Sequence, residues 1–311
     1  MIDDNNLALE AKGLNKIYQS KNGLEINALI DFNINVPKGK TYGLLGPNGA
    51  GKSTFINILG GLVLKNSGQV KICGVDLDLN LKKSRKLIGI VPQEINMDPF
   101  FTPFELLELQ AGLYGVKKKY RKTIEILKKV GLDEQKNYYA RSLSGGMKRR
   151  LLIAKALVHS PRVVILDEPT AGVDVELRQN LWQYVKELNK DGVTVLLTTH
   201  YIHEAEQLCD YISIINKGKI IVSDEKNNIL NIISKKTVTF LLDKEPRTIP
   251  NELKEYNATI NEKSISVNYD KNTTKINEII NILKRNNLTF NEIQTFESDL
   301  EDIFLELTKN K

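Results

Sequence analysis

A glycine-rich segment with one lysine and two hydroxyl side chains is the part of this sequence best suited to bind phosphate. It runs Gly46-Pro47-Asn48-Gly49-Ala50-Gly51-Lys52-Ser53-Thr54 and matches the pattern G-x-x-x-x-G-K-[ST] at every required position. Glycines let backbone N–H groups approach phosphate oxygens, and the N-terminus of the helix expected over 53–59 adds positive potential. In this pattern the lysine reaches the β- and γ-phosphates, and the first hydroxyl holds Mg²⁺. The segment therefore predicts a nucleoside triphosphate site rather than a solvated turn.

Two further polar groups follow apolar runs that have the pattern of buried parallel strands. Asp167-Glu168 follow the run 162–166, and His200 ends the run 193–199, just as the phosphate-binding segment follows 42–45. Taken singly, an Asp-Glu pair is often a solvated turn and a lone histidine is often structural. Ligands bind at the carboxyl edge of such sheets, so we expect the three groups to share one site.

Phosphate chemistry suggests a role for each of these side chains. Ser53 and Asp167 offer the hard oxygen ligands that Mg²⁺ prefers, the carboxylate acting through water. Glu168 can orient the water that attacks the γ-phosphate. His200 can hold either the γ-phosphate or that water. Gln93, which follows a predicted strand over 89–91, has the length to sense Mg²⁺ or the water.

A second candidate anion site lies at the start of a helix predicted over 146–159. The segment is Leu143-Ser144-Gly145-Gly146-Met147. Its serine and two glycines stand where a helix N-terminus presents free N–H groups. A plain N-cap would use the same serine, so the residues alone leave both interpretations open.

The pattern of apolar residues predicts the elements that position these groups. Alternation over 7–17 and 28–36 indicates antiparallel strands, with Ile30, Phe32, Ile34 and Val36 on one side. The stretch 94–160 is mostly helical and includes a capping box at Thr102, which opens a helix over 103–113. Amphipathic helices over 173–189 and 202–208 and strands over 212–215 and 219–222 complete a three-layer α/β unit. After Asp224 the composition shifts, and 229–311 has the pattern of a small α+β domain: strands at 236–242, 264–269 and 290–295, a helix at 276–288 and a terminal helix at 300–309.

Taken in order, these motifs resemble the ATPase subunit of an ABC transporter over about two-thirds of the chain. The resemblance implies a Walker A motif at 46–54, a Q-loop at Gln93 and a signature at 143–147. It implies a Walker B motif ending at Asp167 with Glu168 as the catalytic carboxylate, a D-loop through Asp174 and a switch histidine at His200. Tyr18 stands where the family places an aromatic ring on adenine. Met147, the D-loop sequence Ala-Gly-Val-Asp and the ending at Thr308 resemble the export branch, which has separate ATPase and permease subunits.

This resemblance carries expectations for fold, cofactors and partners. It implies a P-loop NTPase (RecA-like) α/β core with an antiparallel β subdomain, together forming an ATPase domain over 1–228. A helical subdomain is inserted at about 94–160, and a small C-terminal α+β domain follows over 229–311. The ligands implied are ATP and Mg²⁺. The partners implied are a second copy of the chain, paired head-to-tail around two ATP, and an integral membrane permease. The resemblance places the chain in the cytoplasm, peripheral on the inner face of the cell membrane. Pro99-Phe100-Phe101 is a candidate permease contact, with a hydrophobic staple beside the Thr102 cap as the alternative.

Composition narrows the remaining alternatives. The 311 residues are 41% hydrophobic and 26% charged, with a net charge of +6 spread along the chain and two distant cysteines. No run approaches the roughly 18 apolar residues of a membrane span, and the polar N-terminus does not resemble a secretory signal. No basic stripe or recognised module predicts nucleic-acid binding, so no nucleic acid is expected as a partner. A soluble ABC ATPase acting on ribosomes or DNA, an import ATPase and a non-catalytic regulatory subunit remain as rival functions. The transported substrate cannot be inferred from any residue of the sequence.

Overall fold

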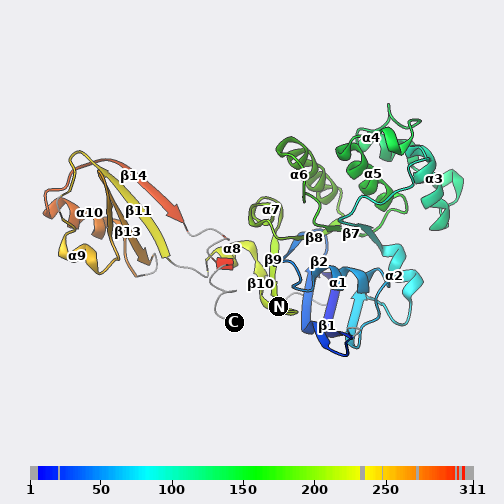
Figure 1. Ribbon diagram of the computed structural model, residues 1–311, viewed down its shortest axis with the longest axis horizontal. Coiled ribbons are helices and arrows are strands. Elements are labelled where there is room, and N and C mark those ends of the chain that lie inside the picture. Colours follow the sequence, from blue (N-terminus) through cyan, green and yellow to red (C-terminus); the bar gives the residue numbers. More distant parts are fainter. Residues whose placement is uncertain are drawn as a thin grey trace. The chain divides into compact units, whose positions relative to one another are not determined.

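The computed structural model divides the chain into two compact units, 1–226 and 227–311. It describes residues 6–19, 22–231, 235–246, 248–270, 273–297, 300 and 303–304. Figure 1 shows the elements of both units with their labels. In the part of the chain so described, no helix combines the length and the apolar character needed to cross a membrane.

A six-stranded sheet forms the centre of the first unit. Its strands are β3 (Thr41–Leu45), β6 (Ile88–Val91), β7 (Val163–Asp167), β8 (Thr194–Thr199), β9 (Tyr211–Asn216) and β10 (Lys219–Glu225). The order is β10-β9-β3-β8-β7-β6, and all neighbouring pairs are parallel except β10 with β9. Every residue of β3, β7 and β8 is buried, which is why these strands are continuous apolar runs with few polar interruptions.

Helices come before or after the strands of this sheet along the chain. They are α1 (Lys52–Leu59), α2 (Leu81–Leu87), α6 (Val175–Lys190), α7 (Ile202–Leu208) and α8 (Lys226–Leu230). Gly43 on β3 shows how tightly α7 packs, because a Cβ there would lie 2.7 Å from the Cys209 sulfur. The predicted mixed α/β core is confirmed, and the helix predicted over 202–208 has those bounds.

A four-stranded antiparallel sheet packs beside α1. It contains β1 (Leu7–Gln19), β2 (Glu25–Pro37), β4 (Ser67–Ile72) and β5 (Val75–Asp76), in the order β2-β1-β4-β5. The predicted inward set on β2 is wrong at one position. Phe32, Ile34 and Val36 are buried, but Ile30 is half-buried and Leu29 takes the inward place. The register slips at this point and Asp31 has φ 43°, so the alternation changes phase across the irregularity.

The predicted helical stretch folds around a hydrophobic core of its own. Its helices are α3 (Pro103–Leu113), α4 (Thr123–Lys129) and α5 (Gly145–Leu157), with short 3₁₀ turns η2 (Lys118–Tyr120) and η3 (Ala140–Ser142) between them. Leu107, Leu127 and Leu151, one from each helix, meet in that core. Figure 1 shows α3, α4 and α5 as one group in this unit. The capping box predicted at Thr102 is present, with both reciprocal hydrogen bonds.

The second unit is a small antiparallel sheet with two helices. Its elements are β11 (Lys235–Leu242), α9 (Asn251–Lys254), β12 (Thr259–Asn261), β13 (Ser264–Asp270), α10 (Ile276–Arg285) and β14 (Phe290–Glu297). The strand order is β12-β13-β11-β14, and Phe240, Ile265 and Ile279 belong to a shared core. The helix predicted over 276–288 ends earlier, because Asn286 caps it and Asn287 turns the chain with φ 57°. Most of the terminal helix predicted over 300–309 lies outside the described residues.

Candidate nucleotide-binding site

Three neighbouring strands bring the predicted polar groups to one edge of the six-stranded sheet. β3 pairs with β8, and β8 pairs with β7, all in parallel. The register sets Leu45 beside Thr199 and Asp167 beside Thr198, so the residues that follow each strand start from adjacent points. The phosphate-binding loop, Glu168 and His200 therefore meet at the carboxyl ends of these strands, as the sequence pattern predicts.

The loop before α1 has the backbone shape that an anion site requires. Gly49 and Gly51 have φ of 79° and 112°, which residues with a side chain rarely adopt. A Cβ on Gly46 would lie 2.4 Å from the carbonyl oxygen of Ile215, and one on Gly51 would lie 2.5 Å from that of Ala28. No side chain caps α1 at Gly51, so the first N–H groups of the helix are left for another acceptor. Such a helix start favours a phosphate.

The other residues of this loop have distinct positions. Pro47, Asn48 and Gly49 are exposed, whereas Ala50 is buried. The carbonyl of Pro47 accepts hydrogen bonds from the Ala50 N–H at 3.2 Å and from the Lys52 ammonium at 3.1 Å. Thr54 lies half-buried in the first turn of α1. The exposed residues thus form the rim of the loop, above its fixed base.

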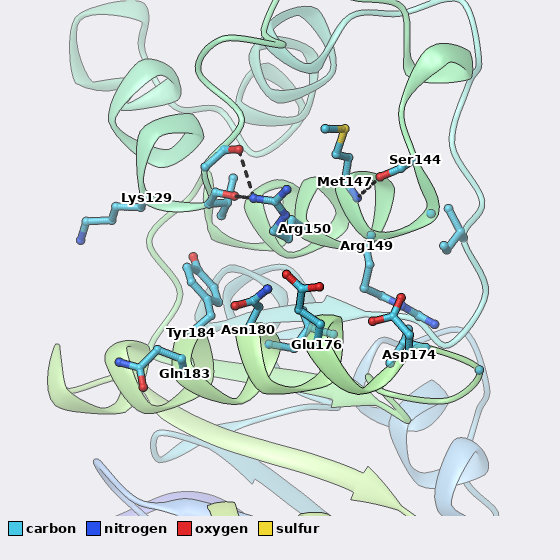
Figure 2. Close-up of a pocket in the computed structure, with 18 of the residues that line it drawn as sticks. Lys129, Ser144, Met147, Arg149, Arg150, Asp174, Glu176, Asn180, Gln183 and Tyr184 are labelled. Atoms are coloured by element: carbon cyan, nitrogen blue, oxygen red, sulfur yellow. Dashed lines mark hydrogen bonds between the residues drawn. The ribbon is translucent and has the colours of Figure 1, made fainter.

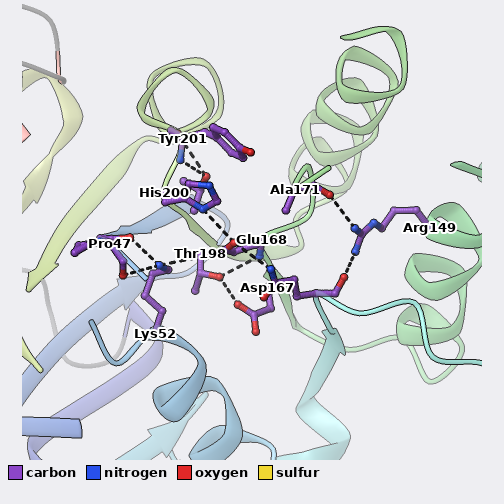
Figure 3. A network of polar contacts seen from close by, with 12 residues as sticks. Pro47, Lys52, Arg149, Asp167, Glu168, Ala171, Thr198, His200 and Tyr201 are labelled. Carbon is purple, nitrogen blue, oxygen red and sulfur yellow. Dashed lines mark hydrogen bonds and ion pairs between the residues drawn. The ribbon is translucent and has the colours of Figure 1, made fainter. Parts of the chain in front are cut away.

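Lys52, Glu168 and His200 form a linked group above this loop (Figure 3). The Lys52 ammonium lies 2.7 Å from the Gly46 carbonyl oxygen and 3.2 Å from Oε1 of Glu168. Nδ1 of His200 lies 3.1 Å from Oε2 of the same carboxylate. The lysine side chain is 4% exposed and Glu168 is buried, while His200 keeps about a third of its surface open. The group therefore holds a lysine ammonium at the floor of a site that remains open on the histidine side.

Glu168 is fixed in place by its own backbone as well. Its φ of 45° puts it in the left-handed region, and its N–H donates to the backbone oxygen and the hydroxyl of Thr198, each at 3.1 Å. The side-chain amide of Gln93, which follows β6, lies 3.4 Å from Oε2 of Glu168. Gln93 thus joins the same site from a fourth strand, β6. Thr198 has a fixing role here that the sequence analysis missed.

Asp167 and Ser53 offer a pair of oxygen ligands beside the loop. The Thr198 hydroxyl donates to Asp167 at 2.6 Å, and the Ser53 hydroxyl acts to lower the pKa of this carboxyl. Burial raises the pKa of Asp167, and the bond from Thr198 opposes that shift. In the described residues no three His, Cys, Asp or Glu side chains gather around a possible metal ion. A hydroxyl and one carboxylate fit Mg²⁺ that takes its remaining ligands from phosphate and water.

The signature residues lie elsewhere, on a cleft of about 800 Å³ between α5 and α6 (Figure 2). Ser144, Gly145, Gly146 and Asp174 line this cleft, as do residues of α6 such as Glu176 and Tyr184. Ser144 also serves as the N-cap of α5, because its hydroxyl accepts the Met147 N–H at 3.2 Å. The plain capping role is therefore real, and Gly145 has open space around it. The glycines at the start of α5 leave the side of the helix that faces the cleft accessible.

The contacts that the structure describes for Tyr18 lie outside both the group around Lys52 and Glu168 and the signature cleft. It is half-buried near the end of β1, opposite Ile26 of β2, with the Lys16 ammonium 4.8 Å from its ring centroid. Its predicted place against adenine stays a prediction.

Arg149 is a further polar residue at the site that sequence reasoning missed. It lies on α5 and is 4% exposed. Its guanidinium donates to the carbonyl of Gln93 at 2.6 Å and lies 3.4 Å from that of Ala171, next to the site residues (Figure 3). Helical spacing could have revealed it, since Leu152 and Ala156, three and seven residues later, are buried on the same face.

Comparison with known proteins identifies the same kind of chain. The family model described as ABC transporter matches residues 29–171. The linearmycin resistance ATP-binding protein of Bacillus subtilis is 38% identical over 232 residues, which are 74% of this chain and 73% of that protein. The Nod factor export ATP-binding protein I of Cupriavidus pinatubonensis is 37% identical over 203 residues, 65% of this chain and 62% of its own length.

Solved structures agree with the sequence relatives. A dimeric ATP-binding cassette in a post-hydrolysis state, bound to ADP and Pi, has a TM-score of 0.62 and 30% identity, covering 70% of this chain and 98% of that one. The ATP-binding subunit of an ABC transporter has a TM-score of 0.64 and 28% identity, covering 72% of this chain and 92% of that chain.

Proposed function

Because the chain belongs to the ABC transporter family, as one of its ATP-binding and ATP-hydrolysing subunits, we propose that it powers an export system. Two copies would bind two ATP head-to-tail and drive a separate membrane permease from its cytoplasmic side. The observation that carries the proposal is the division of the site within one chain. The phosphate-binding residues meet at the sheet edge, whereas the signature residues line a different cleft. The signature residues of a second copy would complete the ATP site that begins at each phosphate-binding loop.

Lys52 and the backbone of the loop bind the triphosphate in this proposal. ATP replaces the Gly46 carbonyl and Glu168 as partners of the lysine ammonium, which then contacts the β- and γ-phosphates. Ser53 and Asp167 would hold Mg²⁺, which would supply positive charge to neutralise the phosphates. The effect of the Ser53 hydroxyl on the pKa of Asp167 supports their placement as ligands of one ion.

Glu168 orients the attacking water, with Gln93 and His200 as its neighbours. The water oxygen bonds to the γ-phosphorus as the bond to the oxygen bridging to the β-phosphate breaks, and the carboxylate receives the water proton. The left-handed backbone of Glu168 and its two bonds to Thr198 hold the carboxylate in place before ATP arrives. His200, with a partly open ring, reaches the γ-phosphate or the water from the exposed side.

Ser144, Gly145 and Gly146 of each copy contact the ATP held by the other copy. The open start of α5 supports this, because a helix N-terminus attracts the γ-phosphate. Asp174 lines the same cleft and faces the subunit boundary in this arrangement. The dimeric cassette found by structural comparison supports the pairing.

The permease contacts the surface near the Q-loop and α3. Phe101 packs against the core of α3, α4 and α5, which includes Leu106, and this supports the hydrophobic staple as its role. Phe100 is 65% exposed with the Arg141 guanidinium 5.5 Å from its ring centroid, and it offers an apolar contact. A groove of about 500 Å³ between α2 and α3, with Leu81 and Leu113 on its rim, adds to this surface. Export as the direction is supported by two relatives, which are named for resistance and for export.

The test is the variant Glu168→Gln, examined by ATPase assay and by light scattering with ATP. We expect hydrolysis to fall at least a hundredfold while ATP converts the protein to a dimer, since binding needs no water-orienting group. Glu125→Gln, an exposed change on α4, is the matched control and should behave as wild type. Normal turnover in Glu168→Gln would overturn the assignment of Glu168. Purification in mild detergent, with mass spectrometry of the membrane protein that is retained, tests the permease; a chain recovered alone would overturn that part.

A further inference from the structure

We propose that Arg149 is a positioning residue, which couples the signature helix to both loops that contact Glu168. The inference rests on the proposed function, because it deepens the account of how that ATPase site is assembled. Arg149 touches neither the phosphate-binding loop nor any reacting atom in this arrangement. It acts through main-chain groups of its neighbours.

The guanidinium of Arg149 is a buried cation held by carbonyl groups. Nη1 donates to the Gln93 oxygen at 2.6 Å and lies 3.5 Å from that of Pro92, and Nη2 lies 3.4 Å from the Ala171 oxygen. Burial lowers the pKa of Arg149, but a guanidinium stays charged in a protein. Among the residues that the structure describes, Arg149 forms no ion pair, and its buried Nε has no hydrogen-bond partner. Burying a charge that is compensated only by carbonyl dipoles costs free energy. These carbonyls must therefore keep their positions around the guanidinium.

Both loops that Arg149 holds also contact Glu168. The Gln93 side chain lies 3.4 Å from the Glu168 carboxylate, while its own carbonyl accepts from Arg149. The Ala171 N–H donates to the Glu168 carbonyl at 3.2 Å, while its carbonyl faces Nη2. One rigid, planar group therefore sets the separation of the two loops on either side of the residue that orients water.

The helix that carries Arg149 begins at the signature. Ser144 caps α5, and Arg149 lies five residues later, in the second turn. A helix moves as a rigid element, so a displacement of its start by a partner's nucleotide is transmitted to the guanidinium. We therefore expect Arg149 to report occupation of the signature to the Glu168 of its own chain.

Arg150 provides a matched control on the next residue of the same helix. Its Nη1 also donates to two carbonyls, those of Val130 at 2.8 Å and Gly131 at 3.1 Å. These acceptors follow α4 and belong to the helical group itself. Replacing Arg150 also removes from α5 a guanidinium that donates to carbonyls. It leaves the contacts of Arg149 with Gln93 and Ala171 in place. A difference between the two positions thus isolates the coupling.

The experiment compares Arg149→Gln, Arg149→Lys and Arg150→Gln in the full-length chain. We expect Arg149→Gln to lower the kcat for ATP between about tenfold and a hundredfold, because small displacements at a reacting centre have effects of that size. Its KM for ATP should change less than threefold, since the phosphate-binding loop is intact. Arg149→Lys, which keeps the charge but cannot bridge both loops, should recover part of the loss. Arg150→Gln should stay within threefold of wild type in both constants.

Hydrogen exchange gives a readout that does not depend on activity. Amides of 93–97 and 170–174 should exchange faster in Arg149→Gln than in wild type, and at the wild-type rate in Arg150→Gln. Equal kcat losses at both positions, or wild-type exchange of these amides in Arg149→Gln, would overturn the role of Arg149. Absence of ATP hydrolysis by the wild-type chain would instead overturn the proposed function, and the exchange measurement would still decide on Arg149.

Discussion

The Lys52 ammonium lies 3.2 Å from the Glu168 carboxylate, so the lysine proposed to bind phosphate is paired with the carboxylate proposed to orient water. Both side chains are buried, and the His200 ring contacts the other oxygen of the same carboxylate. ATP and Glu168 therefore compete for one cation. The γ-phosphate must displace the carboxylate, and it enters a site that already holds a negative charge.

This competition predicts that Glu168→Gln binds ATP more tightly even where no dimer forms. The comparison is made in the Ser144→Arg background, which prevents pairing, with the affinity measured by calorimetry. We expect the dissociation constant to fall about tenfold, equivalent to about 1.4 kcal/mol, because the amide neither holds Lys52 nor repels phosphate. Equal affinity with and without the carboxylate would contradict the idea of competition.

Ser144 offers a test of the composite site. Ser144→Arg places a bulky cation at the start of α5 and should reduce ATPase activity at least a hundredfold, while nucleotide binding by the monomer persists. Ser144→Ala is the control for the N-cap, because it removes the Met147 bond without adding bulk and should cost about 1 kcal/mol of stability. ATPase activity close to wild type in Ser144→Arg would rule out a site shared between two copies.

Gly46 should resist substitution on steric grounds. A methyl group there would lie 2.4 Å from the Ile215 backbone oxygen, which must then move. We expect Gly46→Ala to lower the free energy of unfolding by about 1–3 kcal/mol, as measured by urea denaturation. Gly145→Ala is the comparison, because it adds a methyl in open space within a helix and should leave stability equal or slightly higher. Identical midpoints for wild type and Gly46→Ala would contradict the close approach.

The buried carboxyl of Asp167 predicts a pH dependence of stability. Burial raises its pKa, so the folded chain holds this proton more tightly than the unfolded chain. Stability is therefore lost as pH rises from the ordinary aspartate pKa, about 3.9, through the raised folded value, and the whole cost is present at neutral pH. Asp167→Asn removes the charge yet still accepts from Thr198.

Calorimetric melting of the nucleotide-free protein between pH 4 and pH 8 checks this. Asp167→Asn should melt a few degrees higher at pH 7, since about 1 kcal/mol shifts Tm by roughly 2–4 °C in a domain of this size, and the gain should shrink toward pH 4. The exposed change Asp133→Asn should show no such gain. If Asp167→Asn raised the Tm equally at pH 4 and at pH 8, the buried Asp167 carboxyl would not be the titrating group.

Local chemistry made several elements predictable from sequence alone. The start of the helix Pro103–Leu113 was predictable because Thr102 and Glu105 form a capping box and proline occupies the first helical position. The buried strands β7 and β8 were found because each contains a continuous apolar run, at 163–166 and at 195–197. The polar residues at their ends could then be assigned to one edge, since parallel strands end together.

Features that depend on contacts between distant segments could not be predicted. β4 and β5 were missed because only Val70 and Ile72 are buried in β4, too few to show an alternation. Arg149 was not singled out from the sequence, and only the fold reveals that main-chain oxygens lie around its guanidinium. The pairing of Lys52 with Glu168 could not be predicted either, because the motifs give one residue a role toward phosphate and the other a role toward water.

The helices α3, α4 and α5 enclose apolar side chains that are separate from the cluster under the main sheet. Most of these apolar side chains belong to one segment, although Tyr184 of α6 also packs against them and α5 contacts β6 of the main sheet. In the proposed function this segment carries the permease contact, so exchange of residues 94–160 between related genes would transfer the preference for a membrane partner. Chimaeras built at those two boundaries offer a direct route to redirect this motor to a different transporter.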